Sequence, residues 1–358
     1  MPKSYNHLFS QIASFENLFA AWEAAQRGKR RRPDVAAFER HLESHLLQLE
    51  RQLLDGSYRP GRYRSFYIRE PKRRKISAAP FRDRVVHHAL VRVIAPIFEA
   101  RFSNASYACR VGKGTHRAAN HAQALVRRYP YVLKADVAQF FSSVDHGVLM
   151  GLLARHIACQ PTLALCQMLM SSGDGILASE YTLRFFPGDD LFAALRPRGL
   201  PIGNLTSQFW ANVYLNGFDT LFQRELRLPH VRYCDDLLIF ADAKPTLHAA
   251  LAALHARAAT LRLTLHPLKT RLYHADEGVE FVGYRLFRDH RRLRRSNVRL
   301  FVRRLRRQQR AYRAGQLSAK RLRASLRSWI AHAQHADTYR LRARLLRAHP
   351  FAPPERQP

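Results

Sequence analysis

Apolar residues recur with a helical period over much of this chain. The segments 6–27 and 34–54 show this period near the start, and the leucines of the second segment fall mostly on one face. Residues 58–80 instead predict strands, which the basic run Lys72-Arg73-Arg74-Lys75 interrupts. Further helices are predicted at residues 82–99, 115–128, 245–262, 296–312 and 318–333.

Two short apolar runs flank a pair of acids in the second half of the chain. Residues 230–233 and 237–240 have strand composition, so the sequence predicts a hairpin with Asp235 and Asp236 at its turn. Two neighbouring carboxylates are costly to bury unless a cation neutralises them. Mg²⁺ prefers oxygen ligands and is the natural candidate. An acidic turn by itself is more often only solvated.

A third acid ends another predicted strand 99 residues upstream of this hairpin. Residues 131–136 form that strand and end in Asp136. A site for two metal ions needs ligands from separate elements. Asp136 and Asp235 can supply bridging carboxylates, and the carbonyl of Val137 can add an oxygen. Asp136 alone would more simply be a helix cap, but its combination with the acidic hairpin favours a metal site.

These segments resemble the motifs of reverse transcriptases. Asp136 with Phe140-Phe141 resembles motif A, and Tyr233-Cys234-Asp235-Asp236 resembles motif C. Residues 198–209 resemble motif B, but with Pro201-Ile202-Gly203 where most members have Pro-Gln-Gly, and with Ser207-Gln208 where they have Ser-Pro. That form is similar to the reverse transcriptases of diversity-generating retroelements. Residues 268–270 and 280–284 resemble motifs D and E, so the resemblance spans about residues 50 to 347.

The resemblance implies an α+β fold of the right-hand polymerase type, with fingers, palm and thumb. The palm would carry an antiparallel sheet with packed helices. We expect an N-terminal helical segment, the fingers, the palm with a motif B insertion near residues 198–210, and a basic helical thumb with a short tail. These parts would occupy residues 1–57, 58–129, 130–284 and 285–358.

The resemblance also implies a two-metal nucleotidyl transfer. Asp136 and Asp235 would hold two Mg²⁺ ions, with Mn²⁺ as a possible substitute, and Asp236 would act electrostatically or as an outer ligand. Lys269 of motif D would protonate the leaving group, although an ordinary solvated lysine is an equal alternative. The predicted catalytic residues are Asp136, Asp235, Asp236 and Lys269, and the predicted metal ligands are Asp136, Val137, Asp235 and Asp236.

A second group of residues is predicted to bind the incoming nucleotide. Phe141 would lie beneath the sugar, where an aromatic ring excludes a 2′-hydroxyl, while Phe140 would belong to the core. Ile202 cannot make the hydrogen bond that a glutamine would make, so we expect loose selection of the base pair. Gly203 would allow close approach of the backbone, and Gln208 would order that segment. Basic side chains predicted to contact the triphosphate are Arg74, Lys75, Arg84 and Arg110.

Charge supports a polyanionic partner independently of the motifs. The chain has 60 Lys and Arg against 27 Asp and Glu, a formal charge of +33 and a pI near 11.2. Between residues 285 and 347 there are 21 Lys and Arg against two acids. We expect this region to grip nucleic acid by its phosphates, although a helical bundle with a solvated basic exterior is the alternative. The predicted contacts are Arg303, Arg304, Arg306 and Arg307.

Other classes of protein are less consistent with the sequence. No long uncharged apolar run indicates a membrane span, and the four scattered cysteines suggest reduced thiols in a cytoplasmic protein. A group II intron or retron enzyme would be expected to carry Pro-Gln-Gly, and an intron enzyme a maturase or endonuclease extension after residue 358. An enzyme of antiphage defence, or an RNA-binding protein with an inactive polymerase fold, remain alternatives.

The resemblance implies partners for a bacterial or phage element. They are an RNA template, a DNA or RNA primer, dNTPs, a small basic helical accessory protein that forms an oligomer, and a structured RNA that holds the template repeat. Copying would be error-prone at template adenines.

Overall fold

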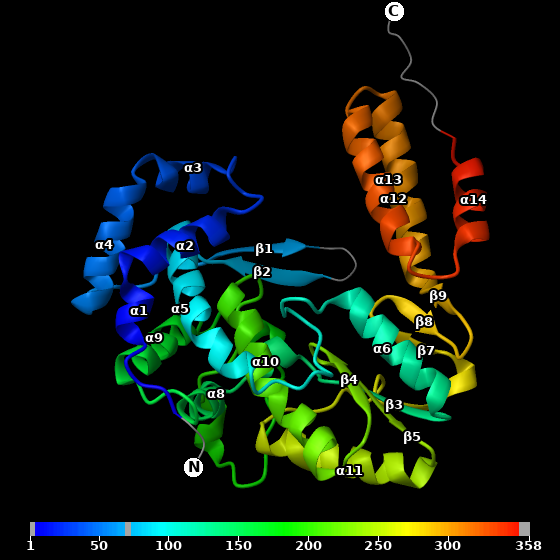
Figure 1. Ribbon diagram of the computed structural model, residues 1–358, viewed down its shortest axis with the longest axis horizontal. Helices are drawn as coiled ribbons and strands as arrows, with labels where there is room; N and C mark the ends of the chain where they lie inside the picture. The colour runs from blue at the N-terminus through cyan, green and yellow to red at the C-terminus, as the bar shows by residue number, and fades with distance from the viewer. Residues whose placement is uncertain (1–3, 69–72, 351–358) are drawn as a thin grey trace, which may run out of the picture.

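A computed structural model of the chain describes residues 4–68 and 73–350. Within these residues the chain forms many helices and three separate antiparallel sheets of two, four and three strands. Figure 1 shows a helical N-terminal half, a central four-stranded sheet and a bundle of C-terminal helices that rises from one end of the molecule. This mixture of helices and antiparallel sheets confirms the predicted α+β class.

The N-terminal helical segments are each divided in two. Ser14 ends the first helix and caps the next, because its hydroxyl accepts a hydrogen bond from the Asn17 amide. A similar break at His41 divides the second predicted helix. The buried faces of these helices pack around the long helix α5. The bounds are α1 Phe9–Ala13, α2 Phe15–Gln26, α3 Pro33–Arg40, α4 Leu42–Leu54 and α5 Phe81–Glu99.

An exposed hairpin follows the N-terminal helices and projects from them toward the C-terminal bundle (Figure 1). It consists of β1, Arg64–Ile68, and β2, Arg74–Ala78, which pair antiparallel. The run does not interrupt the strands as predicted, because Arg74 and Lys75 begin β2 and pair with Ile68 and Tyr67, while Lys72 lies outside the described residues. Every residue of β1 is exposed, so this hairpin contributes little to the core.

The central sheet brings together strands that are far apart in the sequence. Its order is β4-β5-β3-β6, with all neighbours antiparallel. Side chains alternate between its two faces, so Val132, Leu238 and Phe240 pack beneath helix α6, while Leu133 and Ile239 face the larger core with α11. The bounds are β3 Tyr131–Asp136, β4 His230–Tyr233, β5 Asp236–Ala241, β6 Arg271–His274, α6 Thr115–Arg128 and α11 Lys244–Thr260.

The connection between β3 and β4 is mostly helical and contains one long irregular stretch. Helix α10 crosses the core and is buried along most of its length. Residues 172–204 hold only short turns and carry several exposed apolar side chains. The bounds are α7 Phe140–Ser143, α8 His146–Ala154, α9 Gln160–Ser171, η1 Ala178–Glu180, η2 Leu191–Leu195, α10 Leu205–Thr220 and the π-helical turn η3 Leu221–Glu225.

A small sheet leads from the central sheet into the basic C-terminal helices. Stacked rings of Phe301 and Trp329, 3.7 Å apart, hold α12 against α13. Both helices agree with the predicted segments to within two residues. Among the described residues, none of the helices combines the length and apolar character that crossing a bilayer requires. The bounds are η4 Ala275–Glu277, β7 Val279–Phe281, β8 Tyr284–Leu286, β9 Arg291–Leu293, α12 Arg295–Arg313, α13 Ala319–Ala333 and α14 Tyr339–Arg347.

Candidate active site

The acidic turn is a tight hairpin beside the end of β3. Tyr233 pairs with Asp236, which leaves Cys234 and Asp235 as the two residues of the turn. Cys234 has the left-handed φ of +53° that this type of turn requires. Strand β3 pairs with β5 so that Asp136 lies opposite Asp236. The fold therefore brings together the three aspartates that the sequence singled out, from strands about a hundred residues apart.

A cleft of about 1020 Å³ opens above these aspartates. Its walls come from the β1–β2 hairpin, the turn after β3, the irregular segment before α10 and the β7–β8 turn. Its polar lining includes three basic side chains of the hairpin, Arg73, Arg74 and Lys75, together with the three aspartates. Residues predicted for the site that line this cleft are Arg74, Lys75, Asp136, Val137, Phe141, Ile202, Asp235, Asp236 and Lys269.

The carboxylates of the cleft are electrostatically strained. Burial, with added repulsion from Asp136, raises the pKa of Asp235 to about 6. The pKa of Asp236 is also raised by burial, although the Lys134 ammonium, 3.4 Å from its carboxylate, opposes the shift. On Asp136, the Lys269 ammonium lies 2.5 Å from Oδ1. A further cation placed between Asp136 and Asp235 would therefore relieve an unfavourable interaction.

The available oxygens suit Mg²⁺ in part. Within the described part of the chain, no three His, Cys, Asp or Glu side chains converge as a metal site. The two carboxylates of Asp136 and Asp235, with the Val137 carbonyl beside them, form a small donor set. Mg²⁺ is often held by only one or two carboxylates, with substrate phosphates and water completing its shell. The donor set fits an ion that arrives with a nucleotide better than a permanent structural metal.

A buried arginine supports the acidic turn from behind, and the sequence analysis did not identify it. Arg232 and Asp219 are each about 1% exposed and form a pair with Arg232 Nη2 2.6 Å from Asp219 Oδ2. Arg232 also donates to the Cys234 carbonyl at 3.2 Å, to Asn212 and to the Ser106 hydroxyl. The sequence does contain an indication of this pair, namely a single arginine within a short apolar strand. An arginine that is buried in such a strand needs a carboxylate partner.

The predicted nucleotide side of the cleft is partly assembled as expected. Both rings border the cleft, but Phe140 is buried against Tyr214 whereas Phe141 is half-buried. Arg74 is exposed at the start of β2. Lys75 donates to the Ile176 carbonyl at 2.8 Å, so its ammonium already joins the hairpin to the irregular segment.

Two of the predicted triphosphate ligands lie elsewhere. Arg110 donates to the Glu99 carboxylate at 2.7 Å and to two backbone carbonyls, and its side chain is only 6% exposed. Arg84 donates to the Ala79 carbonyl and lies 3.6 Å from Asp34 on α3. Neither lines the cleft. The expectation for these two arginines is therefore corrected, because their guanidinium groups serve internal packing.

The motif B loop is fixed to the hairpin by its backbone. The Ser77 amide donates to the Ile202 carbonyl at 2.8 Å, and the Asn204 side chain donates to the Ser77 carbonyl and accepts from the Ala79 amide. Gly203 has a φ of +123°, and a Cβ there would meet Ile76 at 3.1 Å. The close approach that Gly203 permits is thus to β2 of the hairpin. Gln208 is exposed on α10 and does not line the cleft, while Ser207 closes the loop onto Pro201 at 2.8 Å.

The four predicted phosphate contacts on α12 do not share one face. Arg303 and Arg306 line a shallow groove of about 480 Å³ together with Arg299 and Arg310. Arg304 instead packs its guanidinium over the Phe301 ring at 5.9 Å, and Arg307 is exposed outside the groove. The helical period explains the difference, because positions three and four apart lie together and adjacent positions diverge.

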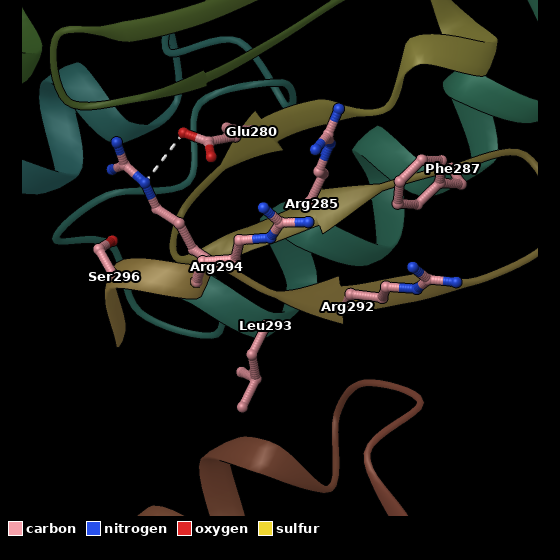
Figure 2. A pocket seen from close by; sticks show the side chains of 8 residues that line it. Glu280, Arg285, Phe287, Arg292, Leu293, Arg294 and Ser296 are labelled. Atoms are coloured by element: carbon pink, nitrogen blue, oxygen red, sulfur yellow. Dashed lines mark ion pairs between the residues drawn. The ribbon is translucent and has the colours of Figure 1, made fainter. Parts of the chain in front are cut away.

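A second basic pocket lies where the small sheet meets α12. Figure 2 shows Arg285 and Arg292 side by side on neighbouring strands, and Arg294 pointing to Glu280. Arg294 Nε lies 2.9 Å from the Glu280 carboxylate, while the other two guanidinium groups face the pocket beside Phe287. This pocket and the groove are lined by successive parts of α12, the pocket by Arg295 and Ser296 and the groove by residues from Val298 onward.

Comparison with known proteins agrees with this geometry. Residues 68–286 match the family described as reverse transcriptase (RNA-dependent DNA polymerase). Protein YkfC of Escherichia coli strain K12 is 26% identical over 281 residues, which cover 67% of this chain and 70% of that protein.

Two intron proteins also match over shorter stretches. Nuclear intron maturase 2, mitochondrial, of Arabidopsis thaliana is 28% identical over 138 residues, 34% of this chain and 19% of that protein. Group II intron-encoded protein LtrA of Lactococcus lactis subsp. cremoris is 23% identical over 180 residues, 49% of this chain and 28% of that protein. The chain therefore spans less than a third of the length of these two relatives.

The family match covers more than half of the chain and includes both acidic strands together with the motif B loop. The cleft, with its strained carboxylates and basic hairpin, lies within the matched residues apart from one side chain of β1. The chain belongs to the reverse transcriptase family and is an RNA-directed DNA polymerase.

Proposed function

We propose that this reverse transcriptase serves a diversity-generating retroelement and copies its RNA template with errors at adenines. The observation that carries this proposal is Ile202, an aliphatic side chain in the wall of the cleft that holds Asp136 and Asp235. The sequence around it, Pro201-Ile202-Gly203, has no side-chain amide that could bond a nascent base pair. A site that selects the incoming nucleotide by shape alone discriminates less well than a site with a hydrogen-bonding side chain. In the second kind of site, an incorrect nucleotide leaves that polar side chain unpaired.

In this proposal, different residues of the chain have different roles in nucleotidyl transfer. Asp136, Asp235 and the Val137 carbonyl would hold two Mg²⁺ ions, which when bound activate the primer 3′-hydroxyl and neutralise charge on the phosphates. Asp236 keeps the site negative and is itself balanced by Lys134. Lys269 would give its proton to the departing pyrophosphate. Its contact with Asp136 favours this role over that of a solvated lysine.

Binding of the nucleotide falls to the hairpin and to the ring beside motif A. Arg74 and Lys75 project into the cleft, where they can meet the triphosphate. Phe141 lies on the same wall and can exclude a 2′-hydroxyl. In this proposal β1–β2 belongs to the fingers, the four-stranded sheet to the palm, and α12 to α14 to the thumb.

The basic C-terminal helices would hold the primer and template. The groove with Arg303 and Arg306 suits phosphates of a duplex, because such contacts follow backbone shape and not base sequence. The RNA template, the primer and dNTPs are the partners of the reaction. A small basic accessory oligomer and a structured template-repeat RNA complete the proposed element.

One observation favours a second candidate within the same family. The relatives include an intron maturase and a group II intron-encoded protein. An enzyme of group II intron type would copy its RNA faithfully, and its selection would not depend on a loose motif B. The two candidates therefore differ in the errors they leave in the product.

The deciding experiment is primer extension on a defined RNA template, with sequencing of the cDNA. The wild-type chain should misincorporate mainly opposite adenine, and Ile202→Gln should lower that error rate by at least about tenfold. Ile202→Leu is the matched control, because it keeps an aliphatic side chain of the same size. Equally low error rates in all three proteins would reject the diversity-generating proposal and leave the intron-like candidate. Asp235→Ala should abolish synthesis in either case.

A further inference from the structure

Two cysteines from separate segments meet beside the catalytic turn. Residues 105–107 run parallel to β4: the Arg232 amide donates to the Ala105 carbonyl, and the Tyr107 amide donates to the Arg232 carbonyl, each at 2.9 Å. The two segments run in the same direction. Cys109 and Cys234, which follow these paired residues in their own segments, therefore lie next to each other. The two side chains thereby lie within interaction reach of each other.

The pair is accessible from one side. Cys109 is exposed, Cys234 is half-buried and lines the cleft, and both are free thiols. The other two cysteines, Cys159 and Cys166, are buried and distant in sequence from the turn. Only the first pair therefore combines a partner thiol with contact to solvent, within the residues that the structure describes.

We propose that Cys109 and Cys234 are an oxidant-sensitive thiol pair, and that a hydroperoxide converts them to a disulfide that disables the active site. This inference rests on the proposed role of Asp235 for its effect on synthesis, but the disulfide itself does not depend on that role.

The chemistry balances in two steps. The exposed Cys109 sulfur attacks one peroxide oxygen, the O–O bond breaks, and the products are a sulfenic acid and water. The Cys234 thiol then attacks the Cys109 sulfur, an S–S bond forms, and the hydroxyl leaves as a second water after taking the thiol proton. The two sulfurs together lose two electrons, which the peroxide accepts. A dithiol reductant reverses the reaction by thiol–disulfide exchange.

The consequence for the enzyme follows from where Cys234 lies. A disulfide holds its sulfurs about 2.05 Å apart, much closer than two thiols that share no covalent bond. Cys234 and Asp235 make up the whole turn between β4 and β5, so drawing one toward residue 109 displaces the other. Metal sites tolerate errors of only about 0.2 Å in ligand distance. A misplacement near 1 Å can cost about 100-fold in rate.

To test this proposal, the purified full-length chain is treated with hydrogen peroxide, and the excess peroxide is removed with catalase. Primer extension is then measured before and after dithiothreitol, and non-reduced peptides are analysed by mass spectrometry. We expect a peptide linked through Cys109 and Cys234, a loss of synthesis of at least about tenfold, and recovery on reduction. Cys109→Ser should have ordinary activity before treatment and should keep it after treatment.

Matched variants distinguish the effect of oxidising this cysteine pair from the effect of oxidation elsewhere in the protein. Cys159→Ala retains both thiols of the pair and should lose activity to peroxide as the wild type does. Equal loss in Cys109→Ser and wild type would overturn the proposal, as would a linked peptide with full activity or the absence of any linked peptide. If Asp235→Ala keeps synthesising cDNA, the proposed catalytic role fails instead, and the linked peptide still reports on the thiol pair.

Discussion

Lys269 Nζ lies 2.5 Å from Oδ1 of Asp136. The ammonium comes from a loop 133 residues further along the chain than the strand whose final carboxylate it neutralises. Its positive charge lies among the clustered aspartates and opposes the rise that burial causes in the pKa of Asp235 and of Asp236. In the proposed mechanism Lys269 also donates a proton to the leaving pyrophosphate.

We therefore expect Lys269→Met to reduce the rate of nucleotide addition about 100-fold or more, because a positioned acid is lost. The Mg²⁺ concentration for half-maximal activity should fall, since nothing else competes for Asp136. Single-turnover extension across a Mg²⁺ titration measures both. Arg271→Met, at an exposed position two residues on, is the control. Equal rates in the two variants would show that Lys269 is only a solvated charge.

The acidity of Asp235 makes stability depend on pH. Its folded pKa of about 6 exceeds the value near 3.9 that an aspartate has in an unfolded chain. Between those values the folded state binds more protons than the unfolded state, so stability falls as pH rises from about 4 to 6. With a chelator present, Asp235→Asn should melt about 2 °C or more above wild type at pH 7 to 8.

That difference in melting temperature should shrink toward pH 4, where the wild-type carboxyl is protonated in the folded state and about half protonated in the unfolded state. Thermal melts from pH 4 to 8 provide the measurement. Asp242→Asn, at an exposed position just after β5, should show no such trend. A stabilisation of Asp235→Asn that does not change with pH would contradict the assigned cause.

Arg232 and Asp219 should be among the most sensitive positions for stability. Removing one partner of a buried pair leaves an uncompensated charge, so Arg232→Gln should lower the free energy of unfolding by about 3–5 kcal/mol. Arg257→Gln disrupts a partly exposed pair with Glu225 and should cost about 1 kcal/mol or less. Urea unfolding of both variants makes the comparison. Similar losses would mean that burial of the Arg232 pair carries no special weight.

The ring of Phe141 should decide which sugar is accepted. Phe141→Ala should raise kcat/KM for ribonucleotides at least about tenfold relative to deoxyribonucleotides, because the bulk beneath the sugar is lost. Phe140→Leu alters the neighbouring buried ring and should change stability without changing that ratio. Steady-state incorporation of a single ATP or dATP is the assay. If Phe141→Ala leaves the preference for deoxyribonucleotides unchanged, Phe141 serves only in packing.

The α12 groove should contribute to the salt dependence of template binding. Replacing both Arg303 and Arg306 with glutamine should lower the slope of log affinity against log salt by about 2, because two phosphate contacts are lost. Replacing Arg304 and Arg307 removes the same charge from outside the groove and should change the slope less. Fluorescence anisotropy with a primer–template duplex at several salt concentrations separates these outcomes. Equal slopes would indicate a diffuse basic field.

Much of this protein was determined by local sequence. Periodic apolar residues set the helices, and the runs before Asp136 and around Asp235 set strands that end in carboxylates, because each depends on neighbours only a few residues away. The core position of Phe140 beside an accessible Phe141 follows from the same local geometry. The resemblance to motif D indicated Lys269, but its contact with Asp136 depends on the loop before β6 and not on the pairing of strands.

Tertiary structure alone decided how similar residues are used. Arg74 and Arg110 are alike in sequence, but one projects into the cleft while the other is held by Glu99. The pairing of Arg232 with Asp219, and of Cys109 with Cys234, joins segments whose proximity no local period reveals. A basic or thiol side chain takes its role from the carboxylate, carbonyl or sulfur that the whole fold places beside it. Local propensity has no information about that partner, because the contact forms only when distant elements pack together.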